Sequence, residues 1–155
     1  MDMQEYAERL EESKGKLYKT AFFYLGDEDA AAEALDETIY RGLKGCRKLK
    51  EPEYFTTWMT KIVMNSCFDE LKRRRRQIPY SELPESADEV FDSLPLKEAL
   101  RRLPKDLKDV VVLRYFSGFT TAETAEILGI PQGTAATRHR RALELLRIEL
   151  KEETV

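Results

Sequence analysis

Two runs of cationic side chains stand out in a chain whose overall charge is slightly negative. The sequence has 26 Lys and Arg residues against 29 Asp and Glu residues, a formal net charge of −3, but residues 72–76 read KRRRR and residues 138–141 read RHRR. Cations of this kind bind DNA phosphates, and an arginine can also bridge a guanine with two hydrogen bonds. The distribution of charge therefore favours nucleic-acid binding at two places, although the net charge alone argues weakly against it.

The first run ends a segment that mixes aromatic and cationic side chains. Tyr54, Phe55 and Trp58 come just before Lys61, Asn65 and the arginines. Bases of melted DNA stack on aromatic rings, and an asparagine can read a base edge, so the segment is typical of a site for single-stranded DNA. Two plainer interpretations stay open. A lone tryptophan on an apolar stripe is more often a core residue, and a run of cations is more often a solvated helix face.

The second run lies in the segment TTAETAEILGIPQGTAATRHRRALEL, residues 120–145. Thr120 and Glu123 fit a capping box that begins a short helix, Gly129 permits a turn, and a longer helix follows. In such a helix-turn-helix, early exposed residues of the second helix meet base edges in the major groove. The alternative is an ordinary helical hairpin with a solvated basic face. The candidate DNA contacts are Gln132, Thr134, Thr137, Arg138 and Arg141.

Apolar residues at helical spacing predict the elements that position these side chains, and no alternating strand pattern is found. The expected helices cover residues 3–25, which Gly26 ends, then residues 27 to about 43, 55–76, 95–103, 104–117, 122–128 and 132–150. The expected buried stripe of the third helix is Phe55, Trp58, Met59, Ile62, Val63 and Leu71. The helix that begins at Pro104 is expected to carry Leu107, Val110, Val111, Leu113 and Tyr115 as its apolar members.

Residues 78–93 differ in character from both flanks. They hold Pro79, Pro84, several serines and five carboxylates, a composition that cannot bury a core. We therefore predict an all-α fold of two small helical domains, residues 1–77 and 94–155, joined by a flexible acidic linker over residues 78–93. The C-terminal domain contains the helix-turn-helix.

Few residues suggest chemistry other than binding. Cys46 and Cys67 are too few and too far apart for a disulfide framework or a zinc site, and we interpret them as small buried or half-buried thiols. A single histidine, the lack of a glycine-rich phosphate loop and the lack of metal-ligand spacing argue against an enzyme, a metal or another cofactor. The sequence begins without a signal peptide and has no apolar run near the ~20 residues that span a bilayer, so we expect a soluble, cytoplasmic protein.

Four segments of the sequence match a known family. The N-terminal match runs through LYKTAFFYLGDEDAAAEALDETIYRGL and WMTKIVMNSCFDELKRRRR, and the C-terminal match through LPKDLKDVVVLRYFSGFTTAETAEILGIP and QGTAATRHRRALELL. Together they cover roughly residues 14–77 and 94–148, and in this order and spacing the chain resembles the extracytoplasmic-function (ECF) class of bacterial RNA polymerase sigma factors. The resemblance implies a stress-response transcription factor that binds core RNA polymerase and directs initiation at promoters. Housekeeping sigma factors have a long N-terminal extension and a middle domain. The resemblance to the ECF class implies that this chain has neither.

The resemblance assigns roles to the first domain. The helix over residues 30–43 would dock on the clamp helices of the polymerase beta-prime subunit, with Asp36 standing where the family usually has a glutamine. The loop over residues 45–54 and the start of the next helix would melt the minus-ten element, and Trp58, Ile62 and Asn65 would hold and read a flipped-out base. The implied docking residues are Glu33, Asp36, Glu37 and Tyr40. The implied minus-ten DNA contacts are Trp58, Lys61, Ile62, Asn65, Arg73, Arg74, Arg75 and Arg76.

The resemblance also assigns roles to the second domain. Thr134, Arg138 and Arg141 match the family's positions for reading the minus-thirty-five element as duplex, and the domain would contact the beta flap of the polymerase. The chain departs from the family at Ala135, Ala136 and His139. Three interpretations of His139 stay open: a packed neutral imidazole, a phosphate contact, or a pH-responsive group. The class implies a further partner, an anti-sigma factor that is often membrane-anchored, and no small-molecule substrate.

Two other functions fit parts of the sequence. A response-regulator type of transcription factor has a similar helix-turn-helix, but it does not explain the Trp58 segment with its arginine run. A helical adaptor that binds only protein fits the acidic linker, but it leaves both basic patches without a role.

Overall fold

The computed structural model describes residues 1–77 and 94–153, and the chain divides into two compact units, Met1–Ala87 and Asp88–Val155. The predicted linker, residues 78–93, lies outside the described residues. The described residues form helices and the short turns between them, without a strand, so the expected all-α fold is confirmed.

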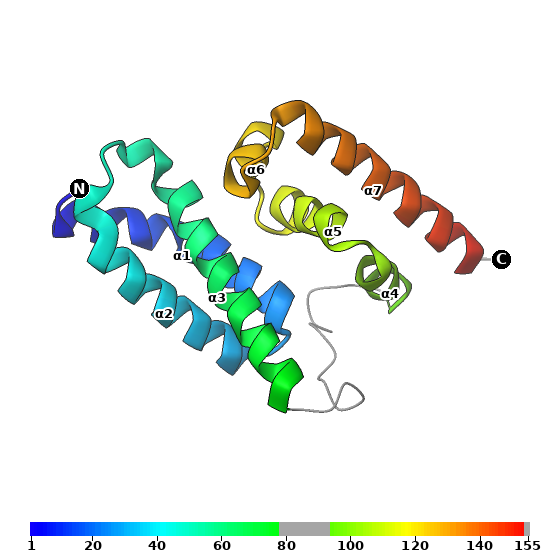
Figure 1. Cartoon of the computed structure of the whole chain (residues 1–155), viewed down its shortest axis with the longest axis horizontal. Helices are drawn as coiled ribbons and strands as arrows, with labels where there is room; N and C mark the ends of the chain where they lie inside the picture. Colours follow the sequence, from blue (N-terminus) through cyan, green and yellow to red (C-terminus); the bar gives the residue numbers. More distant parts are fainter. Residues whose placement is uncertain (78–93, 154–155) are drawn as a thin grey trace. The chain divides into compact units, whose positions relative to one another are not determined.

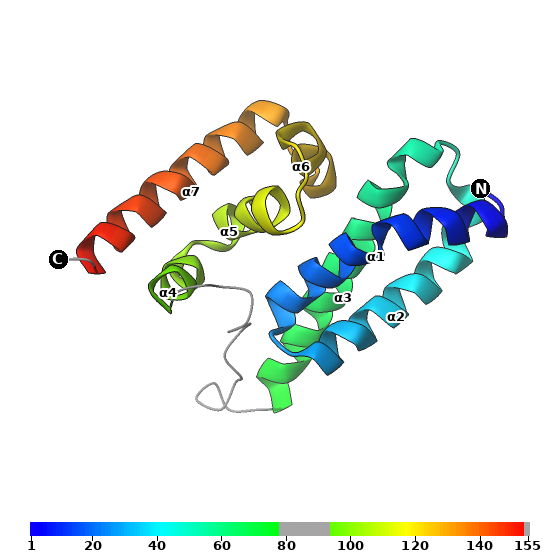
Figure 2. The same cartoon turned by 180° about the vertical axis from the view of Figure 1, so that it is seen from behind.

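The first unit consists of three helices that each pack against the other two (Figures 1 and 2). They are α1 (Met3–Leu25), α2 (Glu28–Gly45) and α3 (Phe55–Gln77). Two short 3-10 helices, η1 (Cys46–Lys48) and η2 (Pro52–Tyr54), lie in the connection that was expected to be a loop. The bounds of α1 match the expected residues 3–25, and Gly26 ends it as expected. The Asp2 carboxylate accepts a hydrogen bond from the main-chain N–H of Glu5, and Gly26 adopts a left-handed φ of 73°.

Close approach of the three helices depends on a small residue near the end of α2. A Cβ atom at Gly42 would lie 2.5 Å from Sδ of Met59 on α3 and 2.7 Å from the Tyr6 hydroxyl on α1. That hydroxyl donates a hydrogen bond to the Ile39 carbonyl, 2.6 Å away, and burial raises the pKa of Tyr6 to about 12. The buried apolar residues of α1 include Tyr6, Leu10, Leu17, Ala21, Phe23 and Leu25. Because α1, α2 and α3 interlock here, the outer faces of α2 and α3 are held in fixed positions.

The second unit is organised around its last helix (Figure 1). The helix α7 (Gln132–Glu153) packs against α4 (Leu94–Arg102), α5 (Lys105–Val111) and α6 (Thr121–Leu128). A π-helical segment, η5 (Val112–Phe116), continues α5. The buried apolar residues of the second unit include Leu103, Leu107, Val110 to Leu113, Phe119, Ala125, Ile127, Ala135, Ala142 and Leu146.

The helix-turn-helix is present as the sequence predicted. Thr120 accepts a hydrogen bond from the main-chain N–H of Glu123, whose carboxylate accepts one from the main-chain N–H of Thr120, so both halves of the capping box are confirmed. Gly129 ends α6 with a φ of 67°, which permits the turn into α7.

One expected core residue lies at the surface. Tyr115 was expected to be an apolar member of its helix, but it is 54% exposed. The main-chain N–H of Ser117 bonds to the carbonyl of Val112, a five-residue step of a π-helix. This step breaks the α-helical spacing on which the expectation for Tyr115 depended.

The described residues contain neither a membrane-spanning helix nor a cluster of metal ligands. No described helix is long and apolar enough to cross a membrane. In the same part of the chain, no group of three or more His, Cys, Asp or Glu side chains could hold a metal ion. The two cysteines are buried free thiols, as expected, and burial raises the pKa of Cys67 to about 12.

Candidate nucleic-acid and protein interfaces

Four of the predicted minus-ten residues share one outer face of α3. An α-helix turns by about 100° per residue, so Trp58, Lys61, Ile62 and Asn65 lie within one stripe, which Lys72 and Arg76 extend toward the end of the helix. Lys61, Asn65, Lys72 and Arg76 are exposed, whereas Trp58 and Ile62 are half-buried. The stripe runs for about 27 Å along α3, given a rise of about 1.5 Å per residue. It presents an aromatic ring, an amide and cations in a single line.

The Trp58 ring lies against the end of α2. A Cβ atom at Gly45 would lie 3.1 Å from Cζ2 of the indole, so the residue at position 45 limits how far the ring can move inward. On the other side, the Phe55 and Trp58 ring centroids are 6.3 Å apart. The expected buried stripe of α3 is thus only partly confirmed. Phe55, Met59 and Val63 are buried, but Trp58 and Ile62 keep part of their surface toward solvent.

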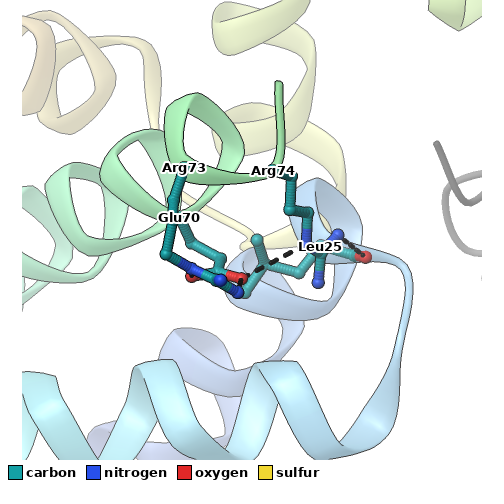
Figure 3. Close-up of polar contacts among 4 residues, drawn as sticks. All are labelled: Leu25, Glu70, Arg73 and Arg74. Atoms are coloured by element: carbon teal, nitrogen blue, oxygen red, sulfur yellow. Dashed lines mark hydrogen bonds and ion pairs between the residues drawn. The ribbon is translucent and has the colours of Figure 1, made fainter. Parts of the chain in front are cut away.

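Two arginines of the run on α3, Arg73 and Arg74, make hydrogen bonds within the first unit (Figure 3). Arg74 is turned inward, with its side chain only 11% exposed, and donates hydrogen bonds to the Leu25 carbonyl at 3.0 Å and to Oε1 of Glu70 at 3.3 Å. Arg73 donates to Oε2 of the same carboxylate at 2.8 Å, although its side chain is exposed. Arg75 and Arg76 are exposed. Arg75 and Arg76 are therefore the side chains of this run most accessible to a phosphate.

Electrostatics supports the same division. The hydrogen bond from Arg73 lowers the pKa of the Glu70 carboxyl, and the nearby guanidinium of Arg74 adds to that effect. The Glu70 carboxylate in turn raises the pKa of Arg73. One negative charge thus offsets part of the positive charge of the run, and the offset falls on Arg73 and Arg74.

The predicted docking residues share the outer face of α2. Glu33, Asp36, Glu37 and Tyr40 are all exposed, and Tyr40 is 54% exposed. Nε of Arg41 lies 2.9 Å from Oε1 of Glu37, and Nζ of Lys44 lies 4.4 Å from the centre of the Tyr40 ring. The structure therefore brings three carboxylates and an exposed aromatic ring together on one helix face.

A hollow of about 360 Å³ lies between α2 and α3. Its acidic lining residues are Glu33, Glu37, Asp69 and Glu70, and its basic lining residues are Arg41 and Arg73. The hydroxyl of Ser66, which also lines it, is buried without a hydrogen-bond partner. Four carboxylates against two guanidinium groups give the lining a net negative charge.

In the second unit, the candidate duplex contacts meet at a groove of about 380 Å³. Thr134, Thr137, Arg138 and Arg141 line it from α7, while Gln132 stands exposed at the first position of that helix. The lining also includes Asp106, Leu107 and Gly133, which sequence reasoning did not name as DNA contacts. Oδ2 of Asp106, on α5, lies 3.7 Å from Nε of Arg138. No local signal marks this pair, because the two residues are distant in sequence and meet only when α5 packs on α7.

His139 points away from that groove and contacts η5. Its Nε2 lies 2.7 Å from the Tyr115 hydroxyl, and the ring is half-buried. Burial lowers the pKa of His139, and the positive charge of Arg114 lowers it further. A neutral imidazole can accept a hydrogen bond from Tyr115, so this contact favours the packed neutral form among the three interpretations.

Comparisons with known proteins cover both units. Residues 10–77 match the family model for sigma-70 region 2, and residues 93–146 match the model for sigma-70 region 4. The chain is 31% identical over 145 residues to the RNA polymerase sigma factor SigV of Bacillus subtilis (strain 168), an alignment that covers 90% of this chain and 87% of the relative. It is 26% identical over 171 residues to the ECF RNA polymerase sigma factor SigW of the same organism, covering 97% and 91%.

A solved structure shows a similar fold. The sigma factor RpoE of Bartonella quintana, determined in complex with the anti-sigma factor NepR, matches with a TM-score of 0.75 at 21% identity. The match covers 96% of this chain and 98% of that one.

Proposed function

The chain belongs to the sigma-70 family of RNA polymerase sigma factors, in the extracytoplasmic-function class, and we propose how its two units divide the work of initiation. As a sigma factor it binds core RNA polymerase and promoter DNA and directs transcription initiation. In our proposal, a domain over residues 1–77 docks on the polymerase and captures the minus-ten element. A domain over residues 94–155 reads the minus-thirty-five element, and residues 78–93 link the two.

Base capture is assigned to the outer face of α3. A base leaving the duplex loses stacking and pairing worth a few kcal/mol, which an aromatic ring and a hydrogen-bonding side chain can offset. Trp58 supplies the ring, Ile62 an apolar wall beside it, and Asn65 an exposed amide one turn further along α3. Lys61 lies on the same face and is placed to contact the adjoining phosphate.

Phosphate binding along α3 is assigned unequally within the arginine run. Arg75 and Arg76 make the principal contacts, because their guanidinium groups are exposed. Arg73 contributes less, since it shares the Glu70 carboxylate. Arg74 acts indirectly, by fixing the end of α3 against the end of α1.

Polymerase docking is assigned to the outer face of α2. Its exposed carboxylates at Glu33, Asp36 and Glu37, with Tyr40 beside them, suit a partner surface that carries cations. The net acidic hollow between α2 and α3 adds to that complementarity. We propose that this face meets the clamp helices of the beta-prime subunit.

Duplex reading is assigned to the N-terminal half of α7. Thr134, Thr137, Arg138 and Arg141 line one groove, in the arrangement by which a recognition helix presents side chains to the major groove. Gln132 stands at the start of the same helix. The same domain would contact the beta flap of the polymerase.

We further propose regulation by an anti-sigma factor. The similar sigma factor of Bartonella quintana was solved with such a partner, which supports an equivalent partner here. We place the protein in the cytoplasm, where RNA polymerase is found, or at the inner face of the membrane when a membrane-anchored partner holds it. The family assignment makes it a regulatory protein, and we assign it no catalytic activity.

The observation that carries the proposal is the shared outer face of Trp58, Ile62 and Asn65, and two single variants test it. Holoenzyme is reconstituted from core polymerase and the full chain, and promoter binding and strand opening are measured separately. Asn65→Ala should reduce strand opening and leave binding of the closed duplex near wild type. Thr134→Ala, the matched control on α7, should weaken duplex binding and leave opening of bound promoters unchanged. If Asn65→Ala weakened only duplex binding and spared opening, the assignment of α3 to base capture would be wrong.

A further inference from the structure

We infer that Asp106 sets how sharply the second domain discriminates among minus-thirty-five sequences, by holding the Arg138 side chain in position to read a base. The inference rests on the proposed role of α7 in duplex reading. It adds a specificity-determining residue that lies outside the recognition helix and outside the helix-turn-helix.

The geometry couples the two side chains at the edge of the groove. Asp106 is in the first turn of α5, and its Oδ2 lies 3.7 Å from Nε of Arg138. The carboxylate meets the inner nitrogen of the guanidinium. The two terminal nitrogens take no part in that contact as it is measured, and nitrogens of this kind can bridge O6 and N7 of a guanine.

The exposures of the two side chains indicate a role in recognition rather than in folding. The Asp106 side chain is 54% exposed and that of Arg138 is 31% exposed, and an ion pair this open to solvent contributes little to stability. Ordering a long, flexible side chain before DNA arrives does reduce the entropy lost on binding. The benefit of the pair should therefore appear when Arg138 contacts its base.

The charge of Asp106 has a second consequence for DNA binding. A carboxylate beside the recognition helix repels phosphates of any sequence, so it weakens binding to every duplex. Asp106 thus has two effects of opposite sign. It lowers affinity for DNA in general and raises the preference for the base pair that Arg138 reads, and this combination distinguishes it from a simple surface charge.

The neighbouring carboxylate of α5, that of Asp109, is placed differently from the carboxylate of Asp106. Asp109 is buried, and Oδ2 of its carboxylate lies 2.9 Å from Nζ of Lys105, so it is tied into the fold of α5. Asp106, one turn earlier, lines the groove beside the candidate DNA contacts. Of these two carboxylates, only Asp106 lines that groove with Arg138.

The test uses holoenzyme of the full chain and a promoter library with a randomised minus-thirty-five element. Sequencing of the transcripts gives the preference at each base pair, and binding of a duplex without a promoter gives the general affinity. Five proteins are compared: wild type, Asp106→Asn, Arg138→Ala, the double variant with both substitutions, and Glu126→Gln as the matched control. Glu126 is an exposed carboxylate of α6 that does not line the groove. Thermal melts check that all five are folded.

Asp106→Asn should reduce the preference at the base pair that depends on Arg138 by about fivefold, with other base pairs unchanged, and should raise general duplex affinity. Glu126→Gln should leave every preference unchanged. In the Arg138→Ala background, Asp106→Asn should have no further effect on preference. Suppose that Arg138→Ala changes the preference at one base pair. If Asp106→Asn then changes the preference at no base pair, or at all of them equally, the inference is overturned, but the proposed role of α7 stands. If Arg138→Ala itself changes none, both fail.

Discussion

The guanidinium of Arg74 donates a hydrogen bond to the carbonyl oxygen of Leu25 across 3.0 Å and so joins the end of α3 to the end of α1. The last carbonyls of a helix have no partner within the helix, and a cation there also complements the negative end of the helix dipole. A residue that sequence reasoning assigned to DNA is thus part of the scaffold of the first unit.

Removing Arg74 should therefore lower stability more than removing its neighbour. Arg74→Ala removes the donor to the Leu25 carbonyl and leaves the Glu70 carboxylate with Arg73 alone, and it should reduce the free energy of unfolding by about 2 kcal/mol. Urea denaturation measures it, and fluorescence of Trp58, the single tryptophan, reports on the first unit. Arg75→Ala is the control and should change the free energy by less than about 0.5 kcal/mol. Equal losses for the two variants would contradict the inward role of Arg74.

Removing Arg76 should instead change how DNA binding responds to salt. Each cation that neutralises a phosphate of duplex DNA contributes about 0.9 to the slope of log affinity against log salt concentration. Arg76→Ala should therefore reduce that slope by roughly this amount in holoenzyme titrations with promoter DNA. Lys19→Ala, at an exposed site of α1 outside the assigned DNA contacts, serves as the control for the same change in net charge. An unchanged slope for Arg76→Ala would exclude the proposed phosphate contact.

Gly45→Ala should impair base capture by displacing the Trp58 ring. The added methyl group would lie 3.1 Å from the indole, which must shift outward by a few tenths of an ångström. A loss of about 1 kcal/mol in stacking would lower the fraction of open complex about fivefold. Quenching of Trp58 fluorescence on promoter opening is the readout.

Gly15→Ala is the matched control for that substitution. A Cβ atom at Gly15, on the exposed side of α1, meets nothing within 4 Å. This variant should open promoters normally and gain about 0.5–1 kcal/mol of stability, because it removes a glycine from a helix interior. If Gly45→Ala opened promoters as well as Gly15→Ala does, the contact between position 45 and the ring would have no part in base capture.

The stability of the second unit should fall as the solution becomes acidic. The pKa of His139 is lowered in the folded protein, so near and below pH 6.5 the unfolded chain binds more protons than the folded chain. The contribution of His139 is therefore fully present above pH 6.5 and is lost as the pH falls through its folded value.

Because the sequence contains a single histidine, its proton resonance can be followed without assignment. The expected midpoint lies below 6.5, and in His139→Leu the melting temperature should depend less on pH between about 5.5 and 7.5 than in wild type. A midpoint above 6.5 would show that folding raises the pKa of His139, which is the opposite of the effect expected from its burial and from the charge of Arg114.

The features that sequence predicted well are those set by local chemistry. The end of α1 at Gly26, and the capping box of Thr120 and Glu123, depend on residues within three or four positions of one another. Partners this close in sequence leave a local pattern that sequence reasoning can recognise. The amphipathic spacing of α3 likewise predicted Phe55, Met59 and Val63 as buried.

The features that sequence did not predict depend on contacts between distant segments. The partner of Arg74 is 49 positions away, and the partner of His139 is 24 positions away. Asp106 meets Arg138 only because α5 packs across α7. The exposure of Tyr115 follows from a π-helical step, and no local sequence signal predicted that step. Such contacts are selected by packing and are not encoded in a local pattern.

The four residues at positions 73–76 are all arginine, but the positions should differ in how well they tolerate substitution during evolution. At position 76 a lysine would keep a point charge for a phosphate, so exchange between the two residue types should be nearly neutral there. At position 74 one planar group serves both the Leu25 carbonyl and the Glu70 carboxylate, and a lysine ammonium does not reproduce that fork. Over many generations, position 74 should retain arginine while its neighbour at 76 alternates, so a basic stretch that looks uniform would carry two different selective constraints.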